Sequence, residues 1–166
     1  MRISISKTWD GNAIPDGEVA HLDARIDGDD LVVLIDAPFG GDPPPPVPVG
    51  GVWKLWENEV VELFLLGADG HHYLEIEVGP YGHHLVLQLE GVRNIARAPI
   101  PIQYVARRRD GRWTGEARMP RTLLPEGPFR ANAYRHQGGK FYAASPVGPE
   151  RDFHQLDRFQ PFDVER

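Results

Sequence analysis

The sequence predicts an all-β protein, an antiparallel β-sandwich. Residues 73–78 alternate apolar and acidic side chains, which is the period of a strand with one buried face. Turn residues, mainly Gly, Asp and Pro, separate short apolar runs along most of the chain. Nowhere do apolar residues recur at helical spacing over about 11 residues or more. About eight to eleven strands without a helix pack as a sandwich or a barrel, and we favour the sandwich.

The N-terminal third contains three expected strands and one long loop. Residues 1–7 and residues 20–26 alternate in polarity. Residues 31–36 are almost continuously apolar, which is typical of a central strand. Residues 38–51 are mostly Pro, Gly and Val. Because proline cannot donate to a strand ladder, we expect this segment to be a surface loop.

The central hairpin organises the chain. Strands 73–78 and 83–90 are expected to be joined by a four-residue loop, 79–82. Alternation then puts the glutamates of the first strand on the face away from the core. The expected cross-strand pairs are Val78 with His83, Leu74 with Leu87 and Ile76 with Leu85 on the core face, and Glu77 with His84, Glu75 with Val86 and Tyr73 with Gln88 on the other face.

Two further hairpins are expected in the second half of the chain. Strands 100–108 and 112–119 flank an Asp-Gly turn, and strands 129–136 and 141–145 flank a Gly-Gly turn. The inward residues of 112–119 would be Trp113, Gly115, Ala117 and Met119, and one face of 129–136 would carry Arg130, Asn132, Tyr134 and His136. The tail 153–159 has three spaced apolar residues that could close the core.

Length and composition limit the classes of protein. A chain of 166 residues with 41% hydrophobic content predicts one globular domain, residues 1–166. A net charge of −6 argues against a nucleic-acid partner. The chain has no cysteine, and no apolar run approaches the roughly 18 residues of a membrane span. The first residues read as a strand rather than a signal peptide, so we expect a cytoplasmic location. The oligomeric state is left open.

Several segments carry a resemblance to a known family. Residues 31–36 form an aliphatic strand that ends in Asp36, and Trp56 is followed by Glu59 and Glu62, an acidic pair three residues apart in an apolar strand. The later segments are 73–77, 113–120, 130–135 and 153–159. In this order, over roughly residues 20–162, they resemble the family 9 carbohydrate-binding modules. The chain is also similar to an uncharacterised intracellular family of the same fold, shared by bacteria and animals.

The resemblance implies a jelly-roll-like sandwich and a lectin-like function. In the sugar-binding family the site is an aromatic clamp around the sugar. One departure is that Glu59 stands where that family usually has Asp. Because fold alone does not fix function, the site must be argued from residue types.

The polar face of the predicted sheet has the chemistry of a sugar site. Pyranose rings offer an apolar face to aromatic side chains and a rim of hydroxyl groups to polar ones. We therefore expect non-catalytic binding of a carbohydrate or similar polyol, with no metal or cofactor. The candidate ligand-binding residues are Trp53, Trp56, Glu62, Tyr73, Glu75, Glu77, His84, Asn132, Tyr134 and His136.

Two alternatives remain at this stage. Glu62, Glu75 and Glu77 could supply paired carboxyl groups to an enzyme such as a glycoside hydrolase. They could equally be structural and pair with Arg118, Arg130 or a histidine on neighbouring strands. The tryptophans Trp53 and Trp113 could likewise belong to the core.

Metal ligation by the histidine pairs is unfavourable in the expected hairpin. His71-His72 and His83-His84 would lie at opposite ends of it, about 20 Å apart. A turn with Asp27, Asp29 and Asp30 has the oxygen ligands of a calcium site, but a solvated turn is the simpler interpretation.

Overall fold

The structure is a computed structural model that describes residues 2–164. This part of the chain contains thirteen strands and four short 3-10 turns. The strands are β1 (Arg2–Ile5), β2 (Lys7–Thr8), β3 (Ala20–Asp27), β4 (Asp30–Pro38), β5 (Val60–Leu66), β6 (His72–Val78), β7 (His84–Glu90), β8 (Ile95–Arg97), β9 (Gln103–Arg109), β10 (Arg112–Pro120), β11 (Phe129–Gln137), β12 (Lys140–Ala143) and β13 (Gln160–Phe162). The turns are η1 (Asp16–Glu18), η2 (Leu55–Glu57), η3 (Arg121–Leu123) and η4 (Leu156–Arg158).

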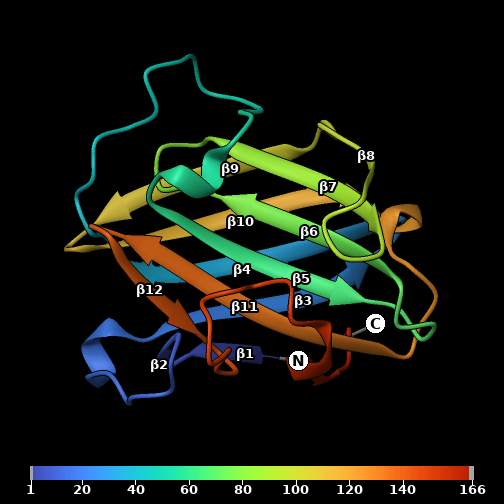
Figure 1. The fold of residues 1–166 in the computed structure, drawn as a ribbon. Coiled ribbons are helices and arrows are strands. Elements are labelled where there is room, and N and C mark those ends of the chain that lie inside the picture. The colour runs from blue at the N-terminus through green and yellow to red at the C-terminus, as the bar shows by residue number, and fades with distance from the viewer. Residues whose placement is uncertain (1, 165–166) are drawn as a thin grey trace.

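The strands form two packed sheets, as the sequence predicts. One sheet has five strands in the order β1-β3-β4-β10-β9. The other has eight, in the order β2-β12-β11-β5-β6-β7-β8, with β13 paired to β11. Figure 1 shows the eight-stranded sheet in front of the five-stranded one. The all-β sandwich is therefore confirmed.

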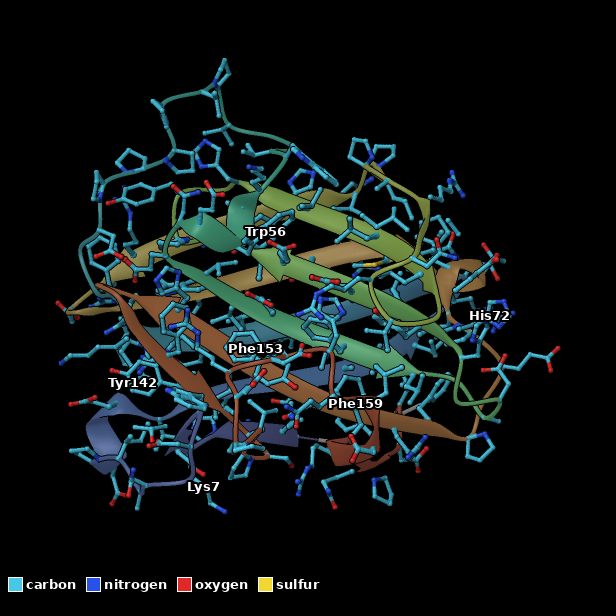
Figure 2. The ribbon with its side chains drawn as sticks, viewed as in Figure 1. Lys7, Trp56, His72, Tyr142, Phe153 and Phe159 are labelled. Carbon is cyan, nitrogen blue, oxygen red and sulfur yellow. The ribbon has the colours of Figure 1, made fainter. Side chains whose placement is uncertain are left out.

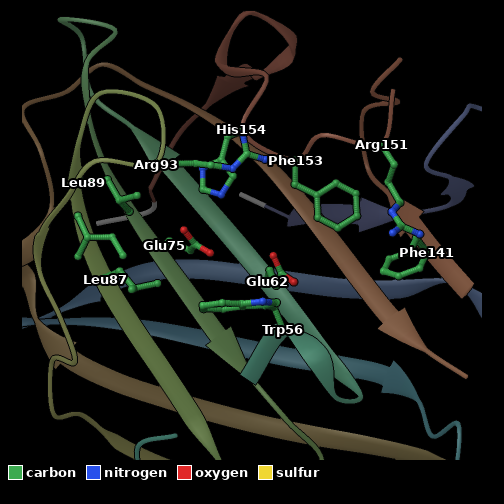
Figure 3. Close-up of a pocket in the computed structure, with 11 residues that line it drawn as sticks. Trp56, Glu62, Glu75, Leu87, Leu89, Arg93, Phe141, Arg151, Phe153 and His154 are labelled. Atoms are coloured by element: carbon green, nitrogen blue, oxygen red, sulfur yellow. The ribbon is translucent and has the colours of Figure 1, made fainter. Parts of the chain in front are cut away.

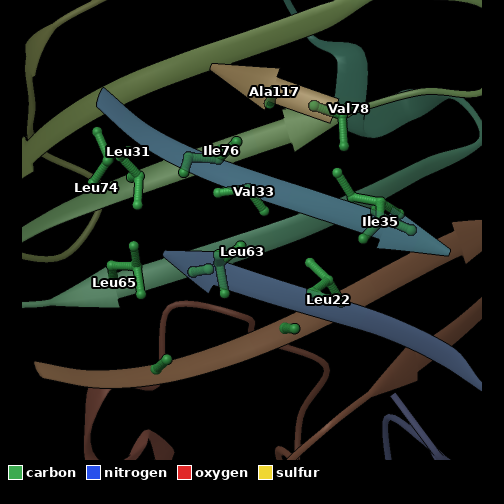
Figure 4. Packing of buried hydrophobic residues seen from close by; sticks show 14 of the residues in the cluster. Leu22, Leu31, Val33, Ile35, Leu63, Leu65, Leu74, Ile76, Val78 and Ala117 are labelled. Atoms are coloured by element: carbon green, nitrogen blue, oxygen red, sulfur yellow. The ribbon is translucent and has the colours of Figure 1, made fainter. Parts of the chain in front are cut away.

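An aliphatic core fills the space between the sheets (Figure 4). Val33 and Ile35 of β4 face this space from one sheet, and Leu63 and Ile76 face it from the other. On β10 the predicted inward residues Trp113, Gly115, Ala117 and Met119 are buried, whereas Thr114 and Glu116 are exposed. We call this cluster the inner core. It includes Leu31, Val33 and Ile35, the alternate residues of the apolar run of β4, which is the central strand of its sheet.

The expected register of the central hairpin is wrong by one residue. The loop between β6 and β7 has five residues, so Val78 pairs with His84 and not with His83. His83 belongs to the loop, where its carbonyl oxygen accepts a hydrogen bond of 2.9 Å from Gly79 N. A shift of one residue turns every side chain of the strand over. Leu85, Leu87 and Leu89 therefore share a face with Glu75 and Glu77, whereas Leu74, Ile76 and Val78 of β6 face the inner core as expected.

The same shift removes His84 from the polar face. Its partner Val78 faces the inner core, and the imidazole packs edge-on against Tyr104 of β9, with ring centroids 6.1 Å apart. The expectation that His84 lies beside Glu77 is therefore wrong.

The outer face of the eight-stranded sheet is covered rather than open. It carries a second apolar cluster, which we call the outer cluster: Leu55, Val60, Phe64, Leu66, Tyr73, Leu85, Leu87, Leu89, Tyr134, Ala143, Val147 and Phe159. Trp56 and Phe153 pack against it from outside the sheet (Figure 2). The C-terminal segment therefore closes a core, as its spaced apolar residues predict, but this core lies on the outer face.

The proline-rich segment is a loop, as expected, and it is anchored to the sheet. The carboxylate of Glu59, immediately before β5, accepts hydrogen bonds from the backbone N–H groups of Gly40 (2.6 Å) and Asp42 (3.1 Å). The loop leads into η2, which carries Trp56. Among residues 2–164, no helix is long and apolar enough to cross a membrane.

Candidate functional site

Three glutamates lie together at the centre of the outer face. On adjacent strands, Glu62 of β5 pairs directly with Glu77 of β6. Glu75 lies two residues before Glu77 and pairs with Phe64. All three are buried, with exposed fractions of 3% for Glu62, 5% for Glu75 and 0% for Glu77. We call these three side chains the acidic floor.

A pocket of about 380 Å³ opens above this floor (Figure 3). This volume lies within the range of small-molecule sites, about 300–1,000 Å³. Glu62 and Glu75 line its base, and Glu77 lies outside the lining. The other lining residues are Trp56, Leu87, Leu89, Arg93, Ile95, Phe141, Arg151, Phe153 and His154.

Burial makes the acidic floor hard to ionise. It raises the pKa of Glu75 to about 7. Burial also raises the pKa of Glu62 and that of Glu77 well above the ordinary range, and repulsion between neighbouring carboxylates adds to both shifts. Like charges placed directly across two strands repel, as Glu62 and Glu77 would. The unliganded floor therefore holds protons near neutral pH.

The acidic floor also lacks basic partners. Within residues 2–164, no arginine, lysine or histidine forms an ion pair with any of the three glutamates. Both carboxyl oxygens of Glu77 are buried without a hydrogen-bond partner in the same part of the chain. The structural alternative, in which cross-strand ion pairs neutralise these residues, is therefore not what the structure shows. Buried acceptors without donors are rare in proteins and are common features of functional sites.

His154 and Arg93 form one wall of the site, and Tyr73 holds both of them from behind. The Tyr73 hydroxyl lies 2.7 Å from His154 Nδ1 and accepts a hydrogen bond from the backbone N–H of Arg93 (3.1 Å). Burial lowers the pKa of His154 to about 4, so its imidazole is neutral at pH 7. Since the Tyr73 oxygen accepts from Arg93, we assign its hydrogen to Nδ1, which leaves the N–H of His154 at Nε2. The Arg93 guanidinium is held by Asp152, at 2.7 Å and 3.3 Å.

Asn132 and Tyr134 support the pocket from behind. Asn132 Nδ2 donates to the Tyr134 hydroxyl (2.8 Å) and to the carbonyl oxygen of Ser145 (2.9 Å). The Tyr134 hydroxyl donates to the carbonyl oxygen of Phe153 (2.9 Å), and the two rings stack with centroids 4.0 Å apart. Both Asn132 and Tyr134 are fully buried. They therefore position Phe153, which lines the pocket, and do not reach the pocket themselves.

Trp56 forms the opposite wall. Its carbonyl oxygen accepts a hydrogen bond from His136 Nδ1 (3.1 Å), and the His136 ring stacks on Phe141 with centroids 4.3 Å apart. Trp53 packs edge-on against Trp56, with centroids 5.5 Å apart, and is 53% exposed. Trp53 therefore supports Trp56 from outside the pocket, and Trp113 belongs to the inner core.

The structure thus divides the ten sequence-predicted residues into four groups. Trp56, Glu62 and Glu75 line the pocket. Trp53 lies outside it, and His84 lies on the other face of the sheet. The remaining five lie on the outer face but behind the lining: Tyr73, Glu77, Asn132, Tyr134 and His136.

Sequence reasoning missed most of the pocket lining. Leu87 and Leu89 were missed through the register error, and Arg93, Ile95 and Arg151 lie in segments without clear periodicity. Phe141 could have been found. The Gly-Gly turn between β11 and β12 pairs His136 with Phe141, which places both on one face.

Metal chemistry has no obvious site in the described part of the chain. Across residues 2–164, no group of three or more His, Asp or Glu side chains is arranged to hold a metal ion. In the turn that was weighed for calcium, Asp27 and Asp30 pair with Arg118, at 2.9 Å and 3.3 Å, and Asp29 lies 3.5 Å from Arg121.

Comparison with solved structures supports the fold. The chain superposes with a TM-score of 0.70 on the crystal structure of a "putative carbohydrate-binding protein" from Bacteroides uniformis. The match covers 96% of this chain and 84% of the other, at 15% sequence identity. An identity this low shows a shared fold only, and the finer resemblance to the family 9 modules stays a prediction.

Comparison with curated sequences shows the family. No family model matches the chain. The UPF0462 protein C4orf33 homolog of Danio rerio is 36% identical, over 99% of this chain and 90% of its own length. The human UPF0462 protein C4orf33 is 34% identical over 98% and 87%, and the mouse homolog is 35% identical over 98% and 91%. At this identity, over nearly full length, the chain belongs to the UPF0462 (C4orf33) family.

Proposed function

We propose that this protein binds a carbohydrate or a similar polyol, without chemical change, in the pocket above the acidic floor. The observation that carries the proposal is the composition of that pocket. Aromatic side chains of Trp56, Phe141 and Phe153 surround a base made of two buried carboxyl groups.

This composition suits the two surfaces of a sugar. Aromatic rings pack against the C–H face of a pyranose, and polar groups bind its hydroxyls. A carboxyl group with a pKa near 7, such as that of Glu75, can accept or donate a hydrogen bond at neutral pH. The Nε2–H of His154 adds a neutral donor to the same pocket.

Two comparisons support the proposal without deciding it. The solved structure of similar fold bears the name of a sugar-binding protein. The ordered segments of the sequence also resemble the family 9 carbohydrate-binding modules. The pocket itself carries more weight, because one fold can host many functions.

The affinity should be modest. Hydroxyl hydrogen bonds replace bonds to water, and each contributes only about 0.5–1.5 kcal/mol net. Aromatic packing should supply most of the rest, so we expect a Kd nearer micromolar than nanomolar.

Isothermal titration calorimetry against a broad panel of sugars and polyols tests this function. At least one compound should bind the wild-type protein, and Trp56→Ala and Glu75→Gln should weaken that binding at least about tenfold, a change of about 1.4 kcal/mol. Glu116→Gln is the matched control, because Glu116 is an exposed glutamate on the other sheet. The assignment fails if nothing binds at millimolar concentration, or if the two pocket variants bind as the wild type does.

Acid–base catalysis is a second candidate, and the raised pKa of Glu75 favours it. A glycoside hydrolase needs one carboxylic acid that stays protonated near neutral pH and a second carboxyl group nearby. Glu75 and Glu62 both lie at the base of the pocket, and Glu62 would have to lose its proton when substrate binds, because burial raises its pKa as well. Turnover of chromogenic glycosides by the wild type, lost in Glu75→Gln, would establish an enzyme. Binding without turnover would favour the non-catalytic function.

A further inference from the structure

The acidic floor has more acceptors than its surroundings have donors. Its three carboxyl groups provide six oxygen atoms, and the hydroxyl and amide donors beside it on the same face are engaged elsewhere. The Tyr73 hydroxyl is directed to His154, that of Tyr134 to Phe153, and the amide of Asn132 to Tyr134 and Ser145. The base that a ligand would reach is formed by the carboxyl groups of Glu62 and Glu75, while His154 and two arginines lie in the walls.

Positive charges near the pocket offset this floor only in part: Arg93 lowers the pKa of Glu75, but burial outweighs this effect. The guanidinium of Arg93 forms its ion pair with Asp152, and burial leaves His154 neutral. Arg151 lies with its guanidinium carbon 3.5 Å from the centroid of Phe141. If all three glutamates ionised, the centre of the pocket would carry excess negative charge, which a buried site tolerates only when a cation pairs with it.

The walls are suited to a cation. Trp56 and Phe153 present aromatic rings to the pocket, and aromatic rings attract ammonium and guanidinium groups. The ring of Phe141 is already covered by His136 and Arg151. The stacking of Arg151 on Phe141 shows that one of these walls already accommodates a cation. Acidic floor and aromatic walls therefore favour the same kind of ligand.

We propose that the ligand of this pocket carries a protonated primary amine, as an amino sugar or another amino polyol does, and that Glu62 and Glu75 bind this ammonium group with Glu77 behind them. An ammonium group has three donors and no acceptor, which matches a base whose two lining groups, Glu62 and Glu75, are both carboxyl groups. The inference rests on the proposed function and narrows its ligand class.

Binding of an ammonium group should be coupled to proton release. The unliganded floor holds protons because burial and mutual repulsion disfavour its charges. A bound cation favours the ionised carboxylates and expels those protons. A neutral sugar carries no charge that favours the ionised carboxylates, so its binding should release no protons.

Matched sugars distinguish the contribution of the amine to binding from that of the sugar ring. Glucosamine, galactosamine and mannosamine are titrated at pH 7 beside their neutral parent sugars and their N-acetyl derivatives, which keep the ring but lose the charge. Because charge-assisted hydrogen bonds are stronger than neutral ones, at least one amino sugar should bind about ten- to a hundredfold more tightly than both neutral forms. Glu75→Gln should remove this preference, and Glu116→Gln should keep it.

Proton release gives an independent readout. At pH 6, where the amines are fully protonated, the calorimetric enthalpy of the amino sugar should change with the ionisation enthalpy of the buffer, in the sense of protons released. The enthalpy of the parent sugar should not change. Glu75→Gln should reduce the number of protons released.

The outcomes distinguish this inference from the function on which it rests. If neutral sugars bind as tightly as amino sugars, or more tightly, the amine assignment is wrong and sugar binding stands. If no member of the panel binds at millimolar concentration, both are wrong. Tighter binding of an amino sugar, with proton release and with loss of the preference in Glu75→Gln, supports both.

Discussion

The acidic residues on the outer faces of the two sheets differ in their exposure and in their basic partners. On the five-stranded sheet, Asp36 pairs with Arg112 at 2.8 Å, and Glu116 lies 3.5 Å from Arg118. These carboxylates are exposed or half-buried, so both water and an arginine side chain stabilise their charge. On the eight-stranded sheet, the acidic floor is buried beneath the C-terminal segment and has no basic partner within the described chain.

This difference shows which glutamates are structural and which need another explanation. Alternation alone predicts outward-facing acids on both sheets, and exposed ion pairs contribute little to stability. Buried carboxyl groups without basic partners are costly, so the presence of two of them at the base of a pocket, with a third behind them, indicates a binding site.

The largest effect should come from the two aromatic residues that anchor the two cores. Phe64 packs in the outer cluster against Tyr134 and Phe159, with ring centroids 5.3 Å and 5.9 Å away, and Trp113 is 1% exposed in the inner core. Phe64→Ala and Trp113→Ala should each lower the free energy of unfolding by about 3–5 kcal/mol, measured by denaturant melts.

The control for this pair is Trp56→Ala. Trp56 is only half-buried at the edge of the outer cluster, so its truncation should cost much less than that of Phe64. If Phe64→Ala were nearly neutral, the outer face would not form a second core and the pocket above it would lose its support.

An intermediate effect should appear when the charge of Glu75 is removed. Its folded-state pKa of about 7 lies above the ordinary value of 4.5, so the folded protein keeps a proton that the unfolded chain has released. The contribution of Glu75 to stability is therefore present below pH 4.5 and is lost as pH rises through about 7. Glu75→Gln should gain stability relative to the wild type between pH 5 and pH 8, by up to about 3 kcal/mol.

The effect of Glu75 is tested by the difference in the free energy of unfolding between Glu75→Gln and the wild type at each pH. His154 has the opposite sign, because its lowered pKa of about 4 gives stability that is present above pH 6.5 and lost as pH falls through about 4. In the pH profile of the wild type by itself, the contributions of Glu75 and His154 to stability partly cancel. Parallel pH profiles for Glu75→Gln and the wild type would show that Glu75 is ionised or solvated in the folded protein.

The smallest effect should come from the same change on the other sheet. Glu116 is exposed beside Arg118, and surface ion pairs of this kind are screened by water and salt. Glu116→Gln should shift the denaturant midpoint by less than the experimental error at both pH 5 and pH 8. A large pH-dependent shift would remove the contrast between the two faces.

Most of the fold could be predicted because strand alternation is a local signal. The inward pattern of β10 and the outward glutamates of β6 need only the period of two. The register of β7 needs the length of its loop. The hydrogen bond between Gly79 and His83 gives a five-residue loop in place of four, which the residue types alone do not distinguish.

The candidate site could be predicted only in part, because its walls come from segments without periodicity. Glu62 and Glu75 follow from alternation, and Trp56 follows from its position beside β5. Arg93 and His154 are brought together through Tyr73, across 81 positions between Tyr73 and His154. Contacts of this kind depend on the path of the C-terminal segment over the sheet, and no local pattern fixes that path.

The central claim is that ligands bind above the acidic floor, and a titration followed by two-dimensional NMR tests it most directly. The tightest-binding compound of the sugar panel is added to labelled protein. The account predicts shifts of the Trp56 indole signal and of the backbone amides of Glu62, Glu75 and His154, with the Trp113 indole and the amide of Glu116 unchanged. Shifts confined to the five-stranded sheet, with the signals around the pocket unmoved, would contradict it.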